Sequence, residues 1–394
     1  MKQYDAIIIG AGPIGCYTAQ LVAKQFHQVA LIEEHPRVGE PLQCAGLVTK
    51  RVFDITKLPQ TSLVLNTIKG AIIHAPQGGL LTIGGDKTHA LVIDRIGFDQ
   101  ALSQQACDAG TEIFLSSKAT AIYKKETSIS VDLTQQETKR TLTGSVLIGA
   151  DGPHSVVRTL FKFPAPKEVL RGIGATVTNI SLDPKYVHIY LGSNIAPGFF
   201  AWIIPTNKIG NEARIGLCCN KTALPKQCFN HLLKQPLLNN ATITNHIGGT
   251  IPLGPLKRTV HDHILLVGDA AAQVKPTSGG GIYPGLVCAR HCATAVNEAL
   301  QDSPVNQQLL DSYHATWTKD IGKELSIGMQ FRKIYQQLTE EQFDTYLQKF
   351  NDDKTRDTIN TYGDIDYPSK LAFPLLKNVP SLLKFLPFLF KRSQ

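Results

Sequence analysis

The stretch YDAIIIGAGPIGCYTAQLVAK (residues 4–24) decides the fold, because it joins an apolar run to a glycine turn and then to an amphipathic segment. Residues 6–9 are predicted to form a buried strand, and the apolar face after the turn predicts a helix. In the turn, Gly10 permits the tight bend, Gly12 lets the backbone approach a pyrophosphate, and Gly15 lets helix and strand pack closely. The N-terminus of the predicted helix offers free N–H groups and a positive dipole to phosphates.

An acidic residue follows at the end of the next predicted strand, in QVALIEE (residues 28–34). The carboxylate of Glu33 can accept hydrogen bonds from ribose hydroxyls, and its charge would repel a 2′-phosphate. Strand, turn, helix and acid together predict a Rossmann-like site for the adenosine diphosphate half of a cofactor other than NADP. Two alternatives stay open here. Glycines at such a turn can serve the fold alone, and the motif does not separate NAD from FAD.

Two later segments also end a predicted strand with an acid. SVLIGADGPHSVVR (residues 145–158) contains Asp151, and HILLVGDAAAQ (residues 263–273) contains Asp269. Open α/β sheets bind their ligands at the carboxyl ends of parallel strands. We therefore expect Asp269 to bind a ribityl or ribose hydroxyl.

Three adjacent glycines precede another predicted helix, in SGGGI (residues 278–282). A flat ring can lie close to their N–H groups because no side chains stand in the way. The dipole of the following helix would stabilise negative charge on the pyrimidine edge of a reduced flavin. The alternative is a loop that needs its glycines only for the turn.

Composition narrows the class of protein. The chain has 394 residues, 43% hydrophobic and 18% charged, without repeats or low-complexity tracts, so we expect about two or three globular domains. The net charge of +8 favours anionic partners, but we expect no nucleic-acid partner. The eight cysteines include no C-x-x-C pair, which predicts reduced thiols, a cytoplasmic protein and no metal site. We also expect neither a secretory leader nor a membrane-spanning helix.

At this point the chain resembles a known family. Motifs similar to those of the FAD-dependent oxidoreductases of the aromatic-hydroxylase superfamily are GAGPIG (10–15), Asp94-Arg95 before GFDQAL, GADG (149–152) and GDA (268–270) with KPTSGGGIYPG (275–285). Within that superfamily, PLQCAGLV (41–48), the GGGIYPG turn and GDIDYPSKLA (363–372) resemble the geranylgeranyl reductase family, especially the archaeal-type lipid reductases.

The resemblance implies a fold, a cofactor and a set of binding residues. The fold is α/β (α+β overall), with a Rossmann-like FAD-binding domain, an inserted antiparallel-sheet substrate domain and a C-terminal helical segment, and the cofactor is FAD. Glu33 would bind the adenosine ribose, Arg95 would reach the FAD phosphate or ribityl region, and Asp269 would hold the ribityl chain. The expected cofactor-binding set is Gly10, Gly12, Gly15, Glu33, Cys44, Ala45, Arg95, Asp269, Gly280, Gly281 and Ile282. Without the family, Arg95 would be interpreted as a surface or salt-bridging residue.

Composition along the chain predicts how these parts are divided. Short β-rich runs with glycine, proline and asparagine turns predict a separate sheet within the nucleotide-binding part. The expected division is a discontinuous FAD-binding domain over 1–60, 90–165 and 250–300, a β-rich substrate domain over 61–89 and 166–249, and a C-terminal helical region over 301–394.

One run in the β-rich part bears on the substrate. PGFFAWIIP (residues 197–205) is similar to the family's P-x-x-Y-x-W-x-F-P element, with Phe200 in place of Tyr and Ile204 in place of Phe. Loss of the hydroxyl makes the position wholly apolar, which suits an isoprenoid chain. We expect Phe200 and Trp202 to line the substrate pocket. The alternative is plain sheet core, and the run also nearly matches the W-x-W-x-I-P element of flavin-dependent halogenases.

The implied activity is FAD-dependent saturation of C=C double bonds in geranylgeranyl chains, on membrane ether lipids or related prenyl compounds. The electron donor would be NAD(P)H, ferredoxin or another reductant. A reduced flavin can deliver hydride while the other carbon gains a proton. Cys44 and Tyr283 are the expected catalytic proton donors beside ordered water, and packing is the alternative for each. Two other functions stay open: an FAD-dependent monooxygenase or halogenase on an aromatic or polyketide substrate, and a flavin electron carrier.

The last segment, LLKNVPSLLKFLPFLFKR (residues 375–392), is basic and apolar. Its lysines, Lys377, Lys384 and Lys391, are seven residues apart, which predicts one basic helical side. Prolines within the segment predict breaks or kinks. Such a tail suits peripheral contact with an anionic membrane, and docking against the protein's own core explains its leucines equally well.

Overall fold

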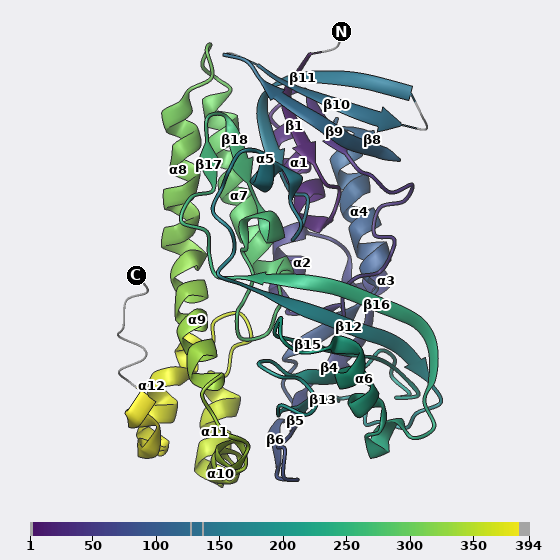
Figure 1. Ribbon diagram of the computed structural model, residues 1–394, viewed down its shortest axis with the longest axis vertical. Coiled ribbons are helices and arrows are strands. Elements are labelled where there is room, and N and C mark those ends of the chain that lie inside the picture. Colours follow the sequence, from purple (N-terminus) through teal and green to yellow (C-terminus); the bar gives the residue numbers. More distant parts are fainter. Residues whose placement is uncertain (1–2, 127, 136–137, 386–394) are drawn as a thin grey trace.

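A computed structural model describes residues 3–126, 128–135 and 138–385. It contains an eight-stranded sheet, a seven-stranded sheet and a three-stranded sheet. The eight-stranded sheet lies in the upper half of Figure 1 and the seven-stranded sheet in the lower half. The predicted α/β fold class, with an FAD-binding half and a mainly antiparallel half, is confirmed, whereas the exact domain division stays a prediction.

The core of the eight-stranded sheet is parallel, as the glycine turn predicted. Its order is β18 (Ile264–Leu266), β11 (Thr138–Gly149), β1 (Gln3–Ile9), β2 (Val29–Ile32) and β8 (Glu112–Phe114), with β17 (Val260–His261) antiparallel at the edge. Residues on both faces of β1 and β2 are buried, which explains their continuous apolar sequence. The strands end at one edge, next to Gly10, Glu33, Ala150 and Gly268.

Two layers cover this sheet. On one face pack the helices α1 (Pro13–Ala23), α4 (Arg95–Asp108) and α7 (Ile282–Ala299). On the other face lie residues of β9 (Ser117–Lys124) and β10 (Ile129–Gln135), which extend the sheet from β11 and fold back over it. The glycine turn thus sits between a buried strand and a helix that cannot shift without opening the core.

The seven-stranded sheet has one face toward the FAD-binding half. Its order is β16 (Thr242–Leu253), β12 (Glu168–Thr178), β15 (Glu212–Cys219), β14 (Ala201–Pro205), β13 (Tyr186–Tyr190), β5 (Gly70–His74) and β6 (Leu80–Gly84). All neighbours are antiparallel except β13 and β5, which pair in parallel. The outer face packs against α6 (Pro225–Leu233), and Cys219 lies there while Cys218 lies on the inner face.

A small sheet lies between the two large ones. It consists of β3 (Leu47–Val48), β7 (Ala90–Ile93) and β4 (Val64–Ile68), and side chains of β7 reach both cores. The remaining short helices outside the C-terminal region are α2 (Arg51–Thr56), α3 (Gln60–Leu63), α5 (Val156–Leu160), η1 (Pro236–Leu238) and η2 (Gly268–Ala271).

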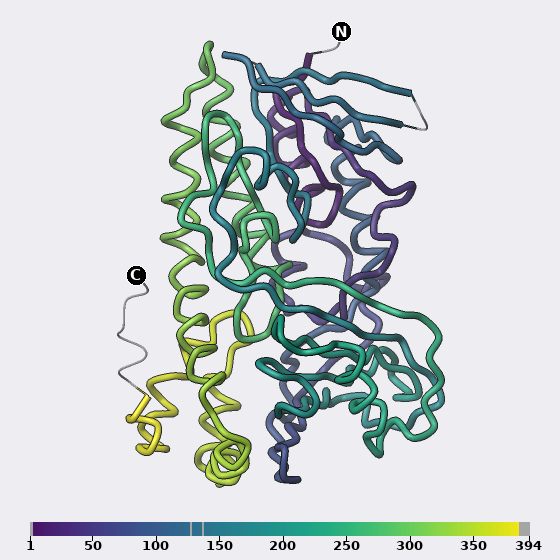
Figure 2. Tube along the Cα trace, in the orientation of Figure 1, coloured from purple at the N-terminus to yellow at the C-terminus, as the bar shows by residue number. Residues whose placement is uncertain are grey.

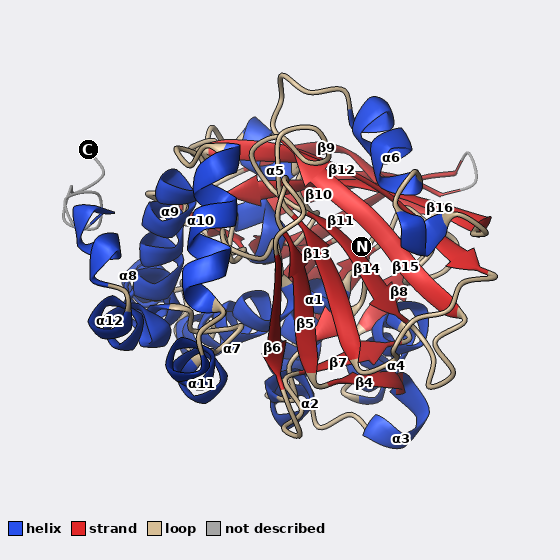
Figure 3. Ribbon diagram, turned by 90° about the horizontal axis from the view of Figure 1, so that it is seen from below, coloured by secondary structure: helices blue, strands red, loops and turns tan. Residues whose placement is uncertain are grey.

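The C-terminal region is helical, as predicted. Its elements are α8 (Gln307–Trp317), the π-turn η3 (Thr318–Gly322), α9 (Lys323–Tyr335), α10 (Glu340–Phe350), α11 (Asp353–Tyr362), α12 (Ser369–Asn378) and η4 (Pro380–Phe385). Figure 3 shows α10 and α11 beside β6 at the edge of the seven-stranded sheet. In Figure 2 the chain after α11 returns toward the start of α7 before it enters α12.

In the described part of the tail, up to residue 385, the lysines do not share the single basic helical side that their spacing predicted. Helix α12 ends at Asn378, and Pro380 begins a separate 3-10 turn, so Lys377 and Lys384 belong to different elements. The reason is that proline lacks the N–H needed to continue a helix. Lys391 lies outside the described residues. In the part of the chain that the structure describes, no helix has both the length and the apolar run needed to cross a bilayer.

Candidate cofactor site and reaction chamber

The glycine turn after β1 is closed on two sides and open on one. Gly10 has φ of 99°, and a Cβ there would lie 2.5 Å from the carbonyl oxygen of Ala150. A Cβ at Gly15 would collide with the carbonyl oxygen of Gly10. Gly12 has no atom within 4 Å of such a position, so its surface is free. Gly10 and Gly15 therefore satisfy packing, and Gly12 is the position that a ligand can approach.

Glu33 organises this turn from the end of β2. Its Oε2 accepts a hydrogen bond of 2.8 Å from the N–H of Ala11. Its Oε1 accepts one of 3.0 Å from the N–H of His35 and lies 2.6 Å from Nδ1 of the same residue. The carboxylate is thereby held beside the first turn of α1, where an adenosine ribose would lie.

Arg95 begins α4 directly after the helix cap. Asp94 caps the helix by accepting a hydrogen bond of 3.1 Å from the N–H of Gly97. Arg95 Nη2 lies 2.5 Å from Asp99 Oδ2 within the same helix. Burial opposes the charge of Arg95, but the carboxylate of Asp99 raises its pKa above the ordinary value. The cation is therefore permanently charged at the edge where the phosphates would lie.

Asp269 and the glycine loop before α7 face one another. A Cβ at Gly281, the N-cap of α7, would lie 2.6 Å from Asp269 Oδ1. Burial raises the pKa of Asp269 to about 6. The Asp269 side chain is partly exposed, whereas Asp151 Oδ1 and Ser278 Oγ are buried without a hydrogen-bond partner among the described residues. Orphaned polar atoms at the edge of a sheet point to a polar ligand that satisfies them.

The loop PLQCAGL (residues 41–47) lies over the end of β7. The thiol of Cys44 is half-buried, and Sγ accepts a hydrogen bond of 3.3 Å from the N–H of Gly46. Arg214, on the inner face of β15, donates to the carbonyl oxygens of Ala45 at 3.1 Å and Ile93 at 3.0 Å. Burial lowers the pKa of Arg214. Sequence reasoning missed this residue, although a cation between buried apolar neighbours in the strand EARIGLCC was a usable signal.

The inner face of the seven-stranded sheet is apolar beside these loops. Phe200 stacks on Phe199 with ring centroids 4.3 Å apart and meets Trp202 edge-on at 6.2 Å. Trp202 packs between two apolar clusters, one reaching Ile251 and the other reaching Ala45. The surface therefore extends from β16 to the PLQCAGL loop.

Two glycines shape this surface. A Cβ at Gly216 would lie 2.7 Å from the Trp202 ring, so the indole rests directly on the bare strand. A Cβ at Gly279 would lie 2.9 Å from Ile251 Cδ1, so the triglycine loop touches the same apolar face. Phe200 and Trp202 thus lie between the two loops that were predicted to hold a flavin.

Tyr283 lies in the first turn of α7, but its hydroxyl is engaged. Tyr283 and Tyr367 share a hydrogen bond of 2.8 Å between their hydroxyls, and the Arg51 guanidinium lies 6.0 Å from the Tyr283 ring centre. Burial, followed by the bond to Tyr367, raises the pKa of Tyr283 above its ordinary value. The segment GDIDYPSKLA resembles a family motif, but nothing in the sequence indicates that it contacts α7.

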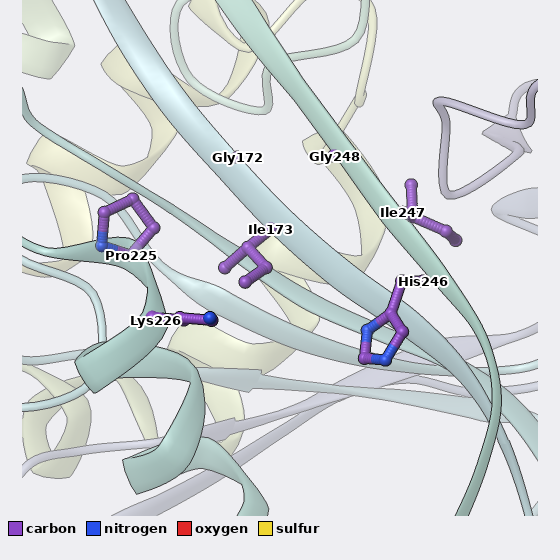
Figure 4. A pocket seen from close by; sticks show the side chains of 7 residues that line it. All are labelled: Gly172, Ile173, Pro225, Lys226, His246, Ile247 and Gly248. Carbon is purple, nitrogen blue, oxygen red and sulfur yellow. The ribbon is translucent and has the colours of Figure 1, made fainter.

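A groove on the far side of the seven-stranded sheet is separate from this site. It lies between α6 and the pair β12 and β16, and Figure 4 shows its lining residues Gly172, Ile173, Pro225, Lys226, His246, Ile247 and Gly248. None of the predicted site residues lines it, so it is not the candidate site. In the ranges the structure describes, no group of three or more His, Cys, Asp or Glu side chains could hold a metal ion.

Fold and site define a dinucleotide-binding flavoprotein, and the comparison with known families agrees. Residues 3–323 match the family described as FAD binding domain, so the chain belongs to this family and FAD is its cofactor. The residues present fit that cofactor: Gly12 is open to a pyrophosphate, Asp151 and Ser278 carry buried unsatisfied polar atoms, and α1 and α7 begin at glycine turns that offer free N–H groups.

Three similar proteins extend the comparison. The chain is 32% identical to an uncharacterized protein of Methanocaldococcus jannaschii, covering 98% of this chain and 97% of the other. It is 28% identical to digeranylgeranylglycerophospholipid reductase 2 of Methanothermobacter thermautotrophicus, covering 98% and 99%. The crystal structure of a geranylgeranyl bacteriochlorophyll reductase-like protein from Thermoplasma acidophilum superimposes with a TM-score of 0.87 at 20% identity, covering 99% and 100%.

Proposed function

We propose that this protein is an FAD-dependent reductase that saturates C=C double bonds in the geranylgeranyl chains of a membrane ether lipid or related prenyl compound. The observation that carries the proposal is the apolar surface of Phe200, Trp202 and Ile251, which lies directly between the two loops of the flavin site. An isolated alkene offers no polar group to recognise, so such a site must select by apolar contact and exclude water. Full-length relatives with digeranylgeranylglycerophospholipid reductase in their names support the same substrate class.

When bound and reduced, FAD supplies a hydride to one carbon of the alkene. The protein does the rest. Gly12 and the N-terminus of α1 hold the pyrophosphate, with Glu33 at the ribose and Arg95 near the phosphates. Asp269 binds the ribityl chain, and the backbone at Gly280, Gly281 and Ile282 holds the pyrimidine edge, where the dipole of α7 stabilises negative charge. Phe200 and Trp202 hold the prenyl chain and keep water away.

The second carbon of the alkene must receive a proton from the protein side. Cys44 is the stronger candidate. Its half-buried thiol lies in the PLQCAGL loop, next to Ala45, whose backbone is expected to touch the flavin ring. Tyr283 is the weaker candidate because its hydroxyl already bonds Tyr367. The electron donor is NAD(P)H, ferredoxin or another reductant, since the chain carries a single G-x-G-x-x-G motif.

The C-terminal helix α12 is the proposed contact with a membrane that carries the lipid. No residue of α12 is buried, and Phe373 is 68% exposed. Lys377 and Lys384 lie on α12 and η4, and residues 370–394 contain no acid. Exposed apolar residues with basic neighbours suit an anionic bilayer surface.

Vesicle co-sedimentation tests this contact. Phosphatidylglycerol vesicles should retain the wild type and lose the variant Lys377→Glu/Lys384→Glu. The control Lys226→Glu/Lys234→Glu changes the net charge equally on α6 and its C-cap, away from the tail, and should keep binding. Equal loss of binding in both variants, or in neither, would refute the assignment to α12.

The reductase activity itself is tested by product analysis. Holoenzyme with dithionite, without oxygen, should convert a digeranylgeranylglycerophospholipid to species heavier by two hydrogens per double bond. With oxygen, halide and an aromatic substrate it should form no hydroxylated or halogenated product. Aromatic products with an unreacted lipid would instead indicate a monooxygenase or halogenase.

A further inference from the structure

The triglycine loop before α7 is built around Lys275. The N–H of Lys275 donates to the carbonyl oxygen of Gly280 at 3.2 Å, and its own carbonyl accepts from the N–H of Gly279 at 2.8 Å. The side chain folds back over the same loop, because a Cβ at Gly280 would lie 3.0 Å from Lys275 Cε and 3.3 Å from Nζ. The position of the Lys275 ammonium therefore determines the conformation of the loop.

The partner of that ammonium comes from the C-terminal region. Lys275 Nζ lies 2.6 Å from Oδ1 of Asp366, and the Asp366 side chain is fully buried. The other oxygen of Asp366 accepts hydrogen bonds from Thr49 Oγ1 at 2.5 Å and Arg51 Nη1 at 3.0 Å. Asp366 thus joins the loop after α11 to the segment that follows PLQCAGL and to the triglycine loop.

Ser278 indicates that this loop is shaped for a ligand. Its Oγ is buried without a hydrogen-bond partner among the described residues and lies 3.5 Å from the Cβ position of Gly280. A buried unsatisfied hydroxyl is destabilising unless a ligand completes it. Lys275 and Ser278 therefore lie on one side of the Gly280 backbone, toward the protein interior. We expect the flavin to bind on the opposite side.

We propose that Asp366 is a positioning residue for FAD, which acts through Lys275 to fix the triglycine loop against the flavin. Removing one partner of a buried charge pair lowers stability far more than removing both partners, since the remaining charge then stays uncompensated. Replacement of Asp366 would leave Lys275 buried with no counter-ion, and the ammonium would leave its place beside Gly280. The N–H groups of the loop would then no longer hold the position that the cofactor needs. This inference rests on FAD binding and not on the prenyl substrate.

The same loop provides a matched control. Asp364 pairs with Arg51 at 2.8 Å and with Lys370 at 3.0 Å, so it belongs to the same ionic network. It makes no ion pair with Lys275 among the described residues. Either Asp364→Asn or Asp366→Asn would weaken the ionic network that holds the C-terminal loop. Only Asp366→Asn also removes the ion-pair partner of Lys275.

The experiment measures FAD affinity of the apoprotein by fluorescence titration and the midpoint potential of the bound flavin. Asp366→Asn should weaken FAD binding tenfold or more and shift the potential, whereas Asp364→Asn should keep the Kd within twofold of the wild type. In a Lys275→Met background, Asp366→Asn should change the Kd less than twofold, because the residue it acts through is gone. Equal effects of the two single variants, or additive effects in the Lys275→Met background, would overturn the proposal.

Asp366→Asn could also fail to fold, and the conservative variant Lys275→Arg covers that case. Arginine keeps a cation that reaches Asp366 but replaces the compact ammonium beside Gly280 with a broader planar group. The FAD Kd should rise severalfold while the unfolding temperature stays near that of the wild type. An unchanged Kd and potential in Lys275→Arg would contradict a role for this side chain in shaping the loop.

Discussion

Arg214, on the inner face of β15, donates a hydrogen bond of 3.1 Å to the carbonyl oxygen of Ala45 in the PLQCAGL loop. The same Nη1 bonds the carbonyl oxygen of Ile93, so one guanidinium joins the substrate-side sheet, the loop and the strand before Arg95. No carboxylate pairs with Arg214 among the described residues, and a buried cation without a counter-ion is costly. The loop therefore has little freedom to move relative to the sheet.

Gly46 is required for this arrangement. It has φ of +70°, and a Cβ there would collide with Arg214 Nη1. Gly46→Ala should reduce FAD affinity on the order of tenfold or more, because the loop must shift away from Arg214. Gly78→Ala is the matched control, since Gly78 has φ of +96° and no atom within 4 Å. Flavin titration of both variants checks this, and equal FAD affinities would contradict the role of Gly46 in holding the loop against Arg214.

The carboxylate of Asp269 should make the apoprotein sensitive to pH. Burial raises its pKa to about 6 from 3.8, so between these values the folded state holds a proton that the unfolded state has lost. Stability due to this group therefore falls as pH rises through that window. Asp269→Asn should raise the free energy of unfolding of the apoprotein at pH 7 by up to about 3 kcal/mol, with no gain near pH 4.

Urea unfolding of the Asp269→Asn apoprotein across pH 4 to 7 measures this difference. The same variant should bind FAD more weakly, because the group that a ribityl hydroxyl would use is changed. Parallel stability curves for wild type and variant would contradict the raised pKa of the Asp269 carboxylate.

Trp202 should govern the use of the prenyl substrate without affecting the cofactor. Trp202→Ala removes a large apolar surface from the chamber, so kcat/KM for the lipid should fall on the order of tenfold while FAD content is retained. Ile203 is its neighbour on the opposite face of β14. Ile203→Val should cost about 1 kcal/mol of stability and leave kcat/KM within twofold. If both variants lowered kcat/KM alike, sheet stability and not chamber shape would be responsible.

Cys44 should matter for proton transfer. Cys44→Ala should keep FAD and lose alkene reduction on the order of 100-fold, the usual range for removal of a general acid. Cys107→Ala, at an exposed thiol of α4, is the control and should behave as the wild type. Full turnover by Cys44→Ala would leave the thiol with a packing role only.

The nucleotide-binding half was predictable because its signals are local. Gly10, Gly12 and Gly15 lie within six consecutive residues, and Glu33 directly follows the next strand. Backbone geometry and hydrophobic periodicity act over these short distances, so strand, turn and helix could be placed from sequence.

Contacts between distant segments were not predictable in the same way. Lys275 and Asp366 are 91 residues apart, and nothing in either local sequence indicates that they meet. Arg214 and Ala45 are separated by 169 residues. The parallel pairing of β13 with β5 likewise depends on the packing of whole sheets.

The central claim is that the flavin and the apolar chamber act together on an alkene, and one single-turnover measurement tests it most directly. The holoenzyme is reduced stoichiometrically without oxygen and mixed with a digeranylgeranylglycerophospholipid, while flavin absorbance and lipid mass are followed in the same sample. We predict that flavin reoxidation and lipid saturation proceed at one rate, with two hydrogens gained by the lipid per flavin oxidised. A flavin that stays reduced in the presence of the lipid, or that reoxidises without any change in lipid mass, would contradict the account.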